Sequence, residues 1–193
     1  MKRLVIVRHG ATEWSVDGRH TGRTDIPLSP EGEAAARTLG HRLRQLGLSP
    51  VRVLSSPRQR AVNTARLAGL GDDLETTDRL QELDYGDYEG RKTVDIRRER
   101  PSWDLFRDGC PNGETLGAAG QRADALLSEL APEDGSGDVA LFGHGHFSRI
   151  LGARYIGLPA PDARYLALST ACICILGHEH EWRAIHLWND APR

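Results

Sequence analysis

The segment LVIVRHG, Leu4 to Gly10, decides the fold and also points to a functional site. Its four branched apolar residues, without a polar break, predict a strand buried on both faces, as in a parallel sheet covered by helices. Arg8 and His9 follow at the carboxyl end, although both side chains are unfavourable to bury. Ligands bind beyond the carboxyl ends of the strands in such sheets, so we predict a site here.

Strands and helices alternate along the rest of the chain. Strands are predicted over 51–56 and 138–143 and on both sides of GHEHE; helices are predicted over 29–46, from Pro57 under a Ser56 cap, over 114–131 and from about Phe147. This order favours one α/β domain over residues 1–193, with parallel central strands and an antiparallel edge hairpin. The stretch 131–138 is predicted to be a loop within the domain.

Composition excludes several classes of function. The net charge of −2 over 193 residues gives no basic field for non-specific nucleic-acid binding. Four apolar positions before Arg8 are too few for a signal peptide or a membrane span, so we predict a cytoplasmic protein without membrane or nucleic-acid partners. Cys172 and Cys174 are interpreted as packing residues, and GHEH at 177–180 as a hairpin turn rather than half of a metal site.

Titratable residues lie at three predicted strand ends. Arg8 and His9 follow the first strand, Arg58 follows the second and His144 follows the strand over 138–143. An arginine in the first turn of a helix faces the positive end of the helix dipole, and a bound anion would make that position favourable. A solvated surface arginine is an equal alternative for Arg58, and Arg60 is interpreted as solvated.

Two histidines and two arginines suit a tetrahedral dianion such as phosphate. A neutral imidazole can attack phosphorus while guanidinium groups stabilise the equatorial oxygens. Gly10 and Gly145, each directly after a histidine, are expected to let backbone amides approach the ligand. The leaving alkoxide needs a proton, and LQELDYGDYEG (80–90) offers two acids, Glu82 and Asp84.

These motifs together resemble the histidine phosphatase superfamily, in the branch that contains cofactor-dependent phosphoglycerate mutases and many phosphatases. RHG at 8–10 is followed in family order by TEW (12–14), TGRTDIPLSPEG (21–32), SSPRQRAVNTA (55–65), ELDYGDYEG (82–90) and GHGHFSRIL (143–151). The resemblance implies an α/β fold, a three-layer α/β/α sandwich with a largely parallel six-stranded sheet and an antiparallel edge strand. It also implies that no metal and no cofactor is needed.

The resemblance implies a role for each matched residue. His9 would be the nucleophile that forms a phosphohistidine, and Glu82 the proton donor. The phosphate pocket would consist of Arg8, Arg58 and His144. Substrate contacts are expected at Ser15, Thr21, Gly22, Tyr85, Gly145 and His146. For His146, a helix-start histidine bonded to backbone is an equal alternative.

Departures from the mutase pattern favour hydrolysis. Ser15 and Thr93 stand where mutases have asparagine and lysine, and the segment 91–114 is too short for their long insertion. TEWS, TGRTDIPLS and GHGHFSR are similar to a mycobacterial acid phosphatase group and a yeast sedoheptulose-1,7-bisphosphatase group. We expect a metal-independent phosphatase for a small phosphomonoester, a sugar phosphate above all. A phosphoglycerate mutase and a phosphoprotein-binding module are the alternatives.

Residues 91–115 are predicted to form a cap over the pocket and to decide the substrate by shape. Arg97, Arg98 and Arg100 in this cap either meet a second phosphate or form a solvated helix face, and the solvated face is favoured. Family members often dimerise through sheet edges, so a homodimer is the one protein partner considered.

Overall fold

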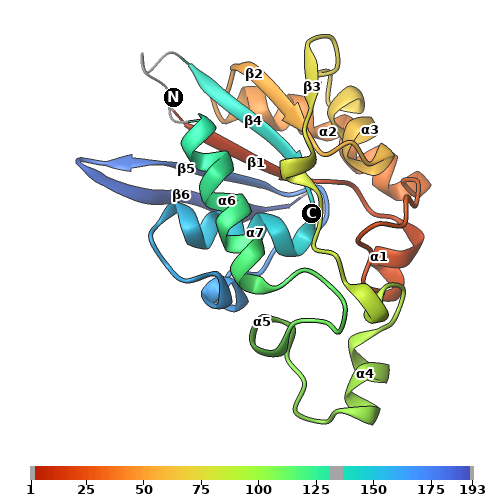
Figure 1. Cartoon of the computed structure of the whole chain (residues 1–193). Coiled ribbons are helices and arrows are strands. Elements are labelled where there is room, and N and C mark those ends of the chain that lie inside the picture. The colour runs from red at the N-terminus through yellow and green to blue at the C-terminus, as the bar shows by residue number, and fades with distance from the viewer. Residues whose placement is uncertain (1–2, 131–136, 192–193) are drawn as a thin grey trace.

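The computed structural model describes residues 3–130 and 137–191, so the predicted loop over 131–138 lies largely outside it. The chain forms one six-stranded sheet in the order β3-β2-β4-β1-β5-β6 (Figure 1). Four strands are mutually parallel: β1 (Leu4–Arg8), β2 (Pro50–Ser55), β3 (Leu74–Thr76) and β4 (Asp138–Gly143). An antiparallel hairpin, β5 (Ile173–Glu179) and β6 (Trp182–Asp190), completes the sheet beside β1. The predicted fold class is confirmed.

Alternation along β1 produces the three layers. Leu4 and Ile6 pack in one core with α6 (Leu116–Leu130) and α7 (Gly145–Tyr155). Val5 and Val7 pack in a second core with α2 (Pro30–Gln45) and α3 (Gln59–Leu67), on the other face. None of these four side chains is more than 1% exposed. Burying each stabilises the fold by about 1.5–3 kcal/mol, which explains the unbroken apolar run.

Helix α2 begins as predicted, while α3 does not. Ser29 caps α2 by accepting the Gly32 N–H at 3.1 Å. In α3, by contrast, the N-cap residue is Arg58 rather than Ser56. The Ser56 hydroxyl binds His144 instead, and the first helical N–H, that of Gln59, donates to the Asp25 carboxylate at 3.1 Å. A partner distant in sequence therefore sets where this helix starts.

The segment between η2 (Gly86–Tyr88) and α6 lies beyond the carboxyl ends of the parallel strands (Figure 1). It contains α4 (Thr93–Glu99) and α5 (Leu105–Asp108), next to α1 (Glu13–Asp17). Trp103 and Phe106 of this segment are buried with the α6 and α7 side chains. A backbone bridge between Arg19 and Lys92 joins it to the loop after α1.

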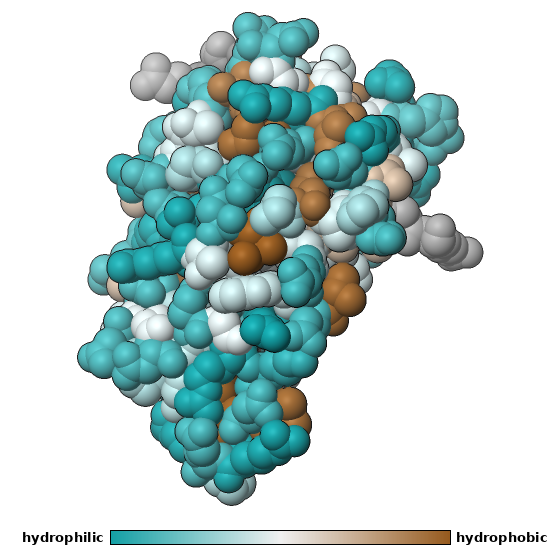
Figure 2. Space-filling view, turned by 90° about the vertical axis from the view of Figure 1, so that its right-hand side faces the viewer, coloured by the Kyte–Doolittle hydropathy of each residue, from teal (hydrophilic) through white to brown (hydrophobic). Residues whose placement is uncertain are grey.

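The remaining predictions concern the periphery of the molecule. GHEHE lies at the tip of the predicted hairpin, where Gly177 to Glu179 end β5 and His180 and Glu181 form the turn to β6. Cys172 and Cys174 are buried in the α6–α7 core. Within the described residues, no helix is long and apolar enough to cross a membrane. The face shown in Figure 2 is largely hydrophilic with scattered hydrophobic residues, and the homodimer stays a prediction.

Candidate active site

Sheet topology brings the three predicted strand ends together. β4 lies between β1 and β2 and is parallel to both, so residues 9, 56–58 and 144 follow neighbouring strands at one edge. The imidazole centroids of His9 and His144 are 5.3 Å apart. We call Arg8, His9, Arg58, Arg60 and His144 the strand-end group.

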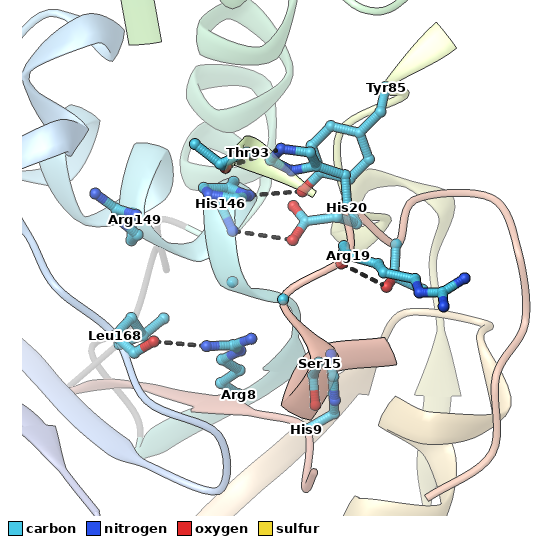
Figure 3. A pocket seen from close by; sticks show the side chains of 14 residues that line it. Arg8, His9, Ser15, Arg19, His20, Tyr85, Thr93, His146, Arg149 and Leu168 are labelled. Carbon is cyan, nitrogen blue, oxygen red and sulfur yellow. Dashed lines mark hydrogen bonds between the residues drawn. The ribbon is translucent and has the colours of Figure 1, made fainter. Parts of the chain in front are cut away.

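A cavity of about 200 Å³ opens beside this group (Figure 3). Among the predicted site residues, eight line it: Arg8, His9, Ser15, Thr21, Glu82, Tyr85, Gly145 and His146. Arg58, His144 and Gly22 do not belong to the lining. In the described part of the chain, no three His, Cys, Asp or Glu side chains converge as a metal cluster would.

His9 is held in one orientation and one tautomer. Its Nδ1 lies 2.7 Å from the carbonyl oxygen of Gly10, and because a carbonyl only accepts, Nδ1 carries the proton. Nε2 then keeps its lone pair. Burial, with additional repulsion from Arg8 and Arg60, lowers the pKa of His9 well below its usual value. The imidazole is therefore neutral, as nucleophilic attack requires.

His144 is fixed in the opposite tautomer. Arg60 Nε donates to His144 Nδ1 at 3.2 Å, so the proton of the ring lies on Nε2, which donates to the Ser56 hydroxyl at 2.7 Å. The side chain is fully buried, and burial, followed by the charge of Arg60, lowers its pKa. His144 is a neutral, rigidly placed member of the group.

Arg60 contradicts the prediction of a solvated arginine. Its side chain is fully buried and, besides binding His144, donates to the carbonyl oxygens of Thr21, Gly22 and Thr24 at 2.8–3.1 Å. Because α3 starts at Gln59, position 60 turns inward. A sequence signal was present, since Arg60 precedes the buried Ala61 on the face that continues with Thr64 and Ala65.

Arg8 and Arg58 carry unsatisfied donors. Arg8 Nη1 donates to the Leu168 carbonyl at 2.6 Å, and Arg58 Nη2 donates to Gln81 Oε1 at 3.0 Å. The Nε atom of each is buried without a hydrogen-bond partner. Neither guanidinium forms an ion pair with a carboxylate of the described residues. Unpaired buried donors with full positive charge suit an anion.

Glu82 is anchored at the start of α7. Its carboxylate accepts the N–H groups of Leu83, His146 and Phe147 at 3.0, 2.9 and 2.8 Å. Asp84, the alternative acid, pairs with Arg23 at 2.6 Å and lies outside the cavity lining. The position of Glu82 in the lining makes it the better candidate for proton transfer.

The two glycines after the histidines allow close packing around the strand ends. A Cβ at Gly10 would lie 2.4 Å from the Gly32 carbonyl oxygen, so this glycine lets α2 pack against the strand end. A Cβ at Gly145 would lie 3.2 Å from Arg8 Cζ. Gly145 thus leaves room for the guanidinium of Arg8, and it also lines the cavity, so the approach of a ligand to its backbone amide stays a prediction.

A second set of residues lines the cavity toward the cap; we call it the cap-side group. Its members are His20, Tyr85, Thr93, His146 and Arg149 (Figure 3). The Tyr85 hydroxyl lies 2.6 Å from His146 Nδ1, and Thr93 Oγ1 lies 3.3 Å from His20 Nε2. The His146 ring thus bonds a side chain, not backbone. Burial lowers the pKa of His20 to about 4 and that of His146 well below its usual value.

Two residues that were expected to contact the substrate form hydrogen bonds within the protein instead. The Ser15 hydroxyl accepts the Thr12 N–H at 2.8 Å and donates to the Thr12 carbonyl, which caps α1. The Gly22 N–H donates to the Glu89 carboxylate at 3.0 Å, and a Cβ there would lie 2.4 Å from the Leu83 carbonyl oxygen.

The cap arginines do not reach the cavity. Arg97, Arg98 and Arg100 are all exposed, and none belongs to the lining. Arg97 binds the Trp103 carbonyl, Arg98 pairs with Asp95, and Arg100 donates to the Tyr88 hydroxyl. The solvated face was the correct alternative. Sequence reasoning missed His20 and Arg149, neither of which follows a predicted strand end.

Comparisons with known proteins agree with this geometry. The sequence model of the Histidine phosphatase superfamily (branch 1) matches residues 4–191. An acid phosphatase from Mycobacterium tuberculosis is 42% identical over 183 residues, which cover 95% of this chain and 90% of that protein. A sedoheptulose 1,7-bisphosphatase from Saccharomyces cerevisiae is 36% identical over 185 residues, covering 81% of this chain and 68% of that protein.

Two further comparisons bear on function and fold. A Salmonella arizonae protein named probable phosphoglycerate mutase GpmB is 31% identical over 193 residues, covering 95% of this chain and 89% of that protein. The solved structure of open reading frame Rv3214 from Mycobacterium tuberculosis superimposes with a TM-score of 0.94 at 40% identity, covering 98% of both chains.

Proposed function

The chain belongs to the histidine phosphatase superfamily (branch 1) and is a phosphatase, and we propose that it hydrolyses a small sugar phosphate through a phosphohistidine on His9. The observation that carries this proposal is the hydrogen bond from His9 Nδ1–H to the Gly10 carbonyl. It leaves Nε2 unprotonated in a ring that burial keeps neutral. An imidazole in this state is a competent nucleophile.

The reaction then takes two displacements. In the first, His9 Nε2 attacks phosphorus, the bond to the ester oxygen breaks, and Glu82 gives a proton to the leaving alkoxide. In the second, water attacks the phosphohistidine, Glu82 takes a proton from that water, and inorganic phosphate leaves. Both steps balance without a metal or a redox partner.

Charge on the phosphoryl oxygens is stabilised by the strand-end group. The unpaired Nε donors of Arg8 and Arg58 support a role in binding the dianion. We add Arg60 to the predicted pocket, because it fixes His144 and lies close enough to His9 to lower the pKa of that ring. Gly145 contributes by giving Arg8 its space.

The substrate class rests on the cap-side group and on the named relatives. Neutral imidazole, phenol and hydroxyl groups suit the hydroxyl groups of a sugar. The relatives named acid phosphatase and sedoheptulose 1,7-bisphosphatase support a phosphorylated metabolite. We treat residues 1–193 as one domain in which 91–115 caps this cavity.

A phosphoglycerate mutase is the second candidate, favoured by the relative named probable phosphoglycerate mutase. A mutase must hold its product while the enzyme is phosphorylated, whereas a phosphatase needs only water to reach the phosphohistidine. Thr93 lines the cavity where a lysine is expected in mutases, and this difference favours attack by water on the phosphohistidine.

The test is phosphate release from sugar phosphates and phosphoglycerates, with chelator present, by wild type and His9→Ala. We expect release by the wild type and a loss of roughly 10⁵-fold or more in the variant, which lacks the nucleophile. His41→Ala, which removes an exposed histidine on α2, is the matched control. Isomerised phosphoglycerate without net phosphate release would establish the mutase instead.

A further inference from the structure

Glu82, the proposed proton donor, lies on a segment without regular structure. Residues 81–85 belong to neither a helix nor a strand and connect η1 (Asp78–Leu80) to η2. The hydrogen-bond ladder of a helix or strand therefore does not fix this part of the main chain, whereas a general acid must lie within hydrogen-bond reach of the atom that it protonates. Contacts from other segments must hold Glu82 in place.

Arg122, on α6, supplies two of these contacts. Its Nη1 donates to the carbonyl oxygen of Gln81 at 2.8 Å and to that of Arg79 at 2.9 Å. Gln81 directly precedes Glu82, so Arg122 fixes the main chain next to the proposed proton donor. Arg122 does not belong to the cavity lining, so it acts on the site through other residues.

Glu114 extends these contacts to the other side of Glu82. Its carboxylate accepts hydrogen bonds from Nε and Nη2 of Arg122 at 2.9 and 2.7 Å, a bidentate pair whose side chains are only 17% and 19% exposed. The Glu114 N–H donates to the carbonyl oxygen of Asp84 at 2.8 Å. This ion pair therefore holds the main chain both before and after Glu82.

The guanidinium of Arg122 also lies against a residue that binds the Glu82 carboxylate. Its Cζ is 3.8 Å from the centre of the Phe147 ring, within the range of a cation–π contact. The Phe147 N–H donates to Glu82 Oε1 at 2.8 Å, and the His146 N–H donates to Oε2 at 2.9 Å. Arg122 thus contacts both the segment that carries Glu82 and the helix start that orients its carboxylate.

On this basis, and resting on the proposed function, we propose that Arg122, through its ion pair with Glu114, is a positioning residue that holds Glu82 in place for proton transfer. Loss of Arg122 would displace the carboxylate without removing its chemistry. Because a misplacement of about 1 Å can cost about 10²-fold in rate, a reaction that needs this proton should slow markedly. A reaction with a good leaving group should be spared.

The test compares two substrates whose leaving groups differ in their need for a proton. Fructose 6-phosphate releases an alkoxide, whereas p-nitrophenyl phosphate releases a stable phenolate. The ratio kcat/KM covers only the steps up to loss of the leaving group, so the hydrolysis of the phosphohistidine does not enter. In Arg122→Met, kcat/KM should fall about 10- to 100-fold on fructose 6-phosphate and less than about threefold on p-nitrophenyl phosphate. Equal losses on both substrates would show a merely structural role and overturn the inference.

Two further variants and a matched control complete the series. Arg122→Lys keeps the charge opposite Glu114 but not the forked geometry, so it should recover part of the rate on fructose 6-phosphate. Glu114→Gln should show the same substrate preference to a smaller extent. The control, Glu129→Gln, breaks the exposed Arg79–Glu129 pair, which also joins η1 to α6, and should stay within about twofold of wild type on both substrates. A selective loss in Glu129→Gln as large as that in Arg122→Met would overturn the assignment to Arg122.

Hydrogen exchange tests the placement of Glu82 without turnover. N–H groups in the first turn of a helix have no acceptor within the helix, so protection of the His146 amide depends on Glu82. Arg122→Met should speed exchange of this amide by about 10-fold or more, the range for one lost hydrogen bond to a charged group, and Glu129→Gln should not. Unchanged exchange in Arg122→Met would overturn the inference even if the phosphohistidine mechanism held.

Glu82→Gln separates this inference from the proposed reaction. If this variant loses kcat/KM selectively on fructose 6-phosphate and Arg122→Met does not, the proposed proton donor stands and the positioning role fails. Equal losses on both substrates in Glu82→Gln would instead overturn the proton donor itself, and the positioning role with it.

Discussion

The strand-end group and the cap-side group line one site but are fixed by different means. His9, Arg60 and His144 are buried, and their polar contacts within the protein select one tautomer for each ring. The cap-side residues come from the loop after α1, the segment 85–93 and α7, and a single side-chain hydrogen bond joins each imidazole to a neighbour. The difference supports our proposal that the chemistry takes place at the rigid strand ends and that the substrate is selected where the cap meets the cavity.

Glu82→Gln should show the largest of the effects considered in this comparison. A carboxamide cannot protonate a sugar alkoxide, so turnover of sugar phosphates should fall by about 10²–10⁴-fold. Turnover of p-nitrophenyl phosphate should fall less, because p-nitrophenolate leaves without a proton. Equal losses on both substrates would show that another residue donates the proton, and Asp84→Asn would then be the variant to measure.

Replacing Arg58 and Arg60, the two arginines near the start of α3, should reveal different contributions to catalysis. Arg60→Met should lower kcat/KM by about 10²–10³-fold, because His144 loses its partner and charge near the phosphate disappears. Arg58→Met removes a guanidinium that does not bind His144 and should lose less. Melting temperatures of both variants control for folding, since Arg60 also donates hydrogen bonds to three backbone carbonyl oxygens. A larger loss of kcat/KM in Arg58→Met than in Arg60→Met would contradict the greater role expected for Arg60.

Acid should destabilise the fold through its buried histidines. Unfolded His20 takes up a proton near its ordinary pKa of 6.5, whereas burial holds the folded pKa at about 4. Stability is therefore complete above pH 6.5 and is lost as the pH falls from 6.5 toward 4, by up to about 1.4 kcal/mol per pH unit. Urea unfolding of wild type and His20→Asn should show a shallower decline in the variant. The same decline in both would contradict a neutral His20.

Arg98→Ala should show the smallest effect. Its side chain is exposed and, among the described residues, pairs with Asp95 alone, one turn away on α4. Such pairs contribute roughly 0–1 kcal/mol to stability, and the guanidinium does not line the cavity. We expect kcat/KM within about twofold of wild type on mono- and bisphosphates. A selective loss on bisphosphates would mean that the cap reaches the substrate after all.

The sequence predicts the strand-end group, except for Arg60, because local patterns determine its other members. A continuous apolar run followed by Arg8 and His9 specifies a buried strand and its carboxyl end, and DVALFG before His144 does the same. Since parallel strands share an edge, convergence of these residues follows without knowledge of side-chain positions.

The features that sequence patterns could not predict depend on contacts between residues far apart in the chain. The start of α3 depends on Asp25, which lies 34 residues before its partner Gln59. The burial of Arg60 depends on His144, which lies 84 residues after it. Strand β3 is only three residues long and carries no alternating pattern. His20 and Arg149 enter the site through packing against Trp103 and Phe106, which no spacing in the sequence reveals.

A covalent phosphate on His9 can be trapped directly. Wild type mixed rapidly with a ³²P-labelled sugar phosphate and quenched in base should retain label in a burst, because phosphohistidine survives base and is lost in acid. Peptide mapping should place the phosphate on His9, and His9→Ala should retain none. Phosphate release without bound label, or label on His144, would contradict the account.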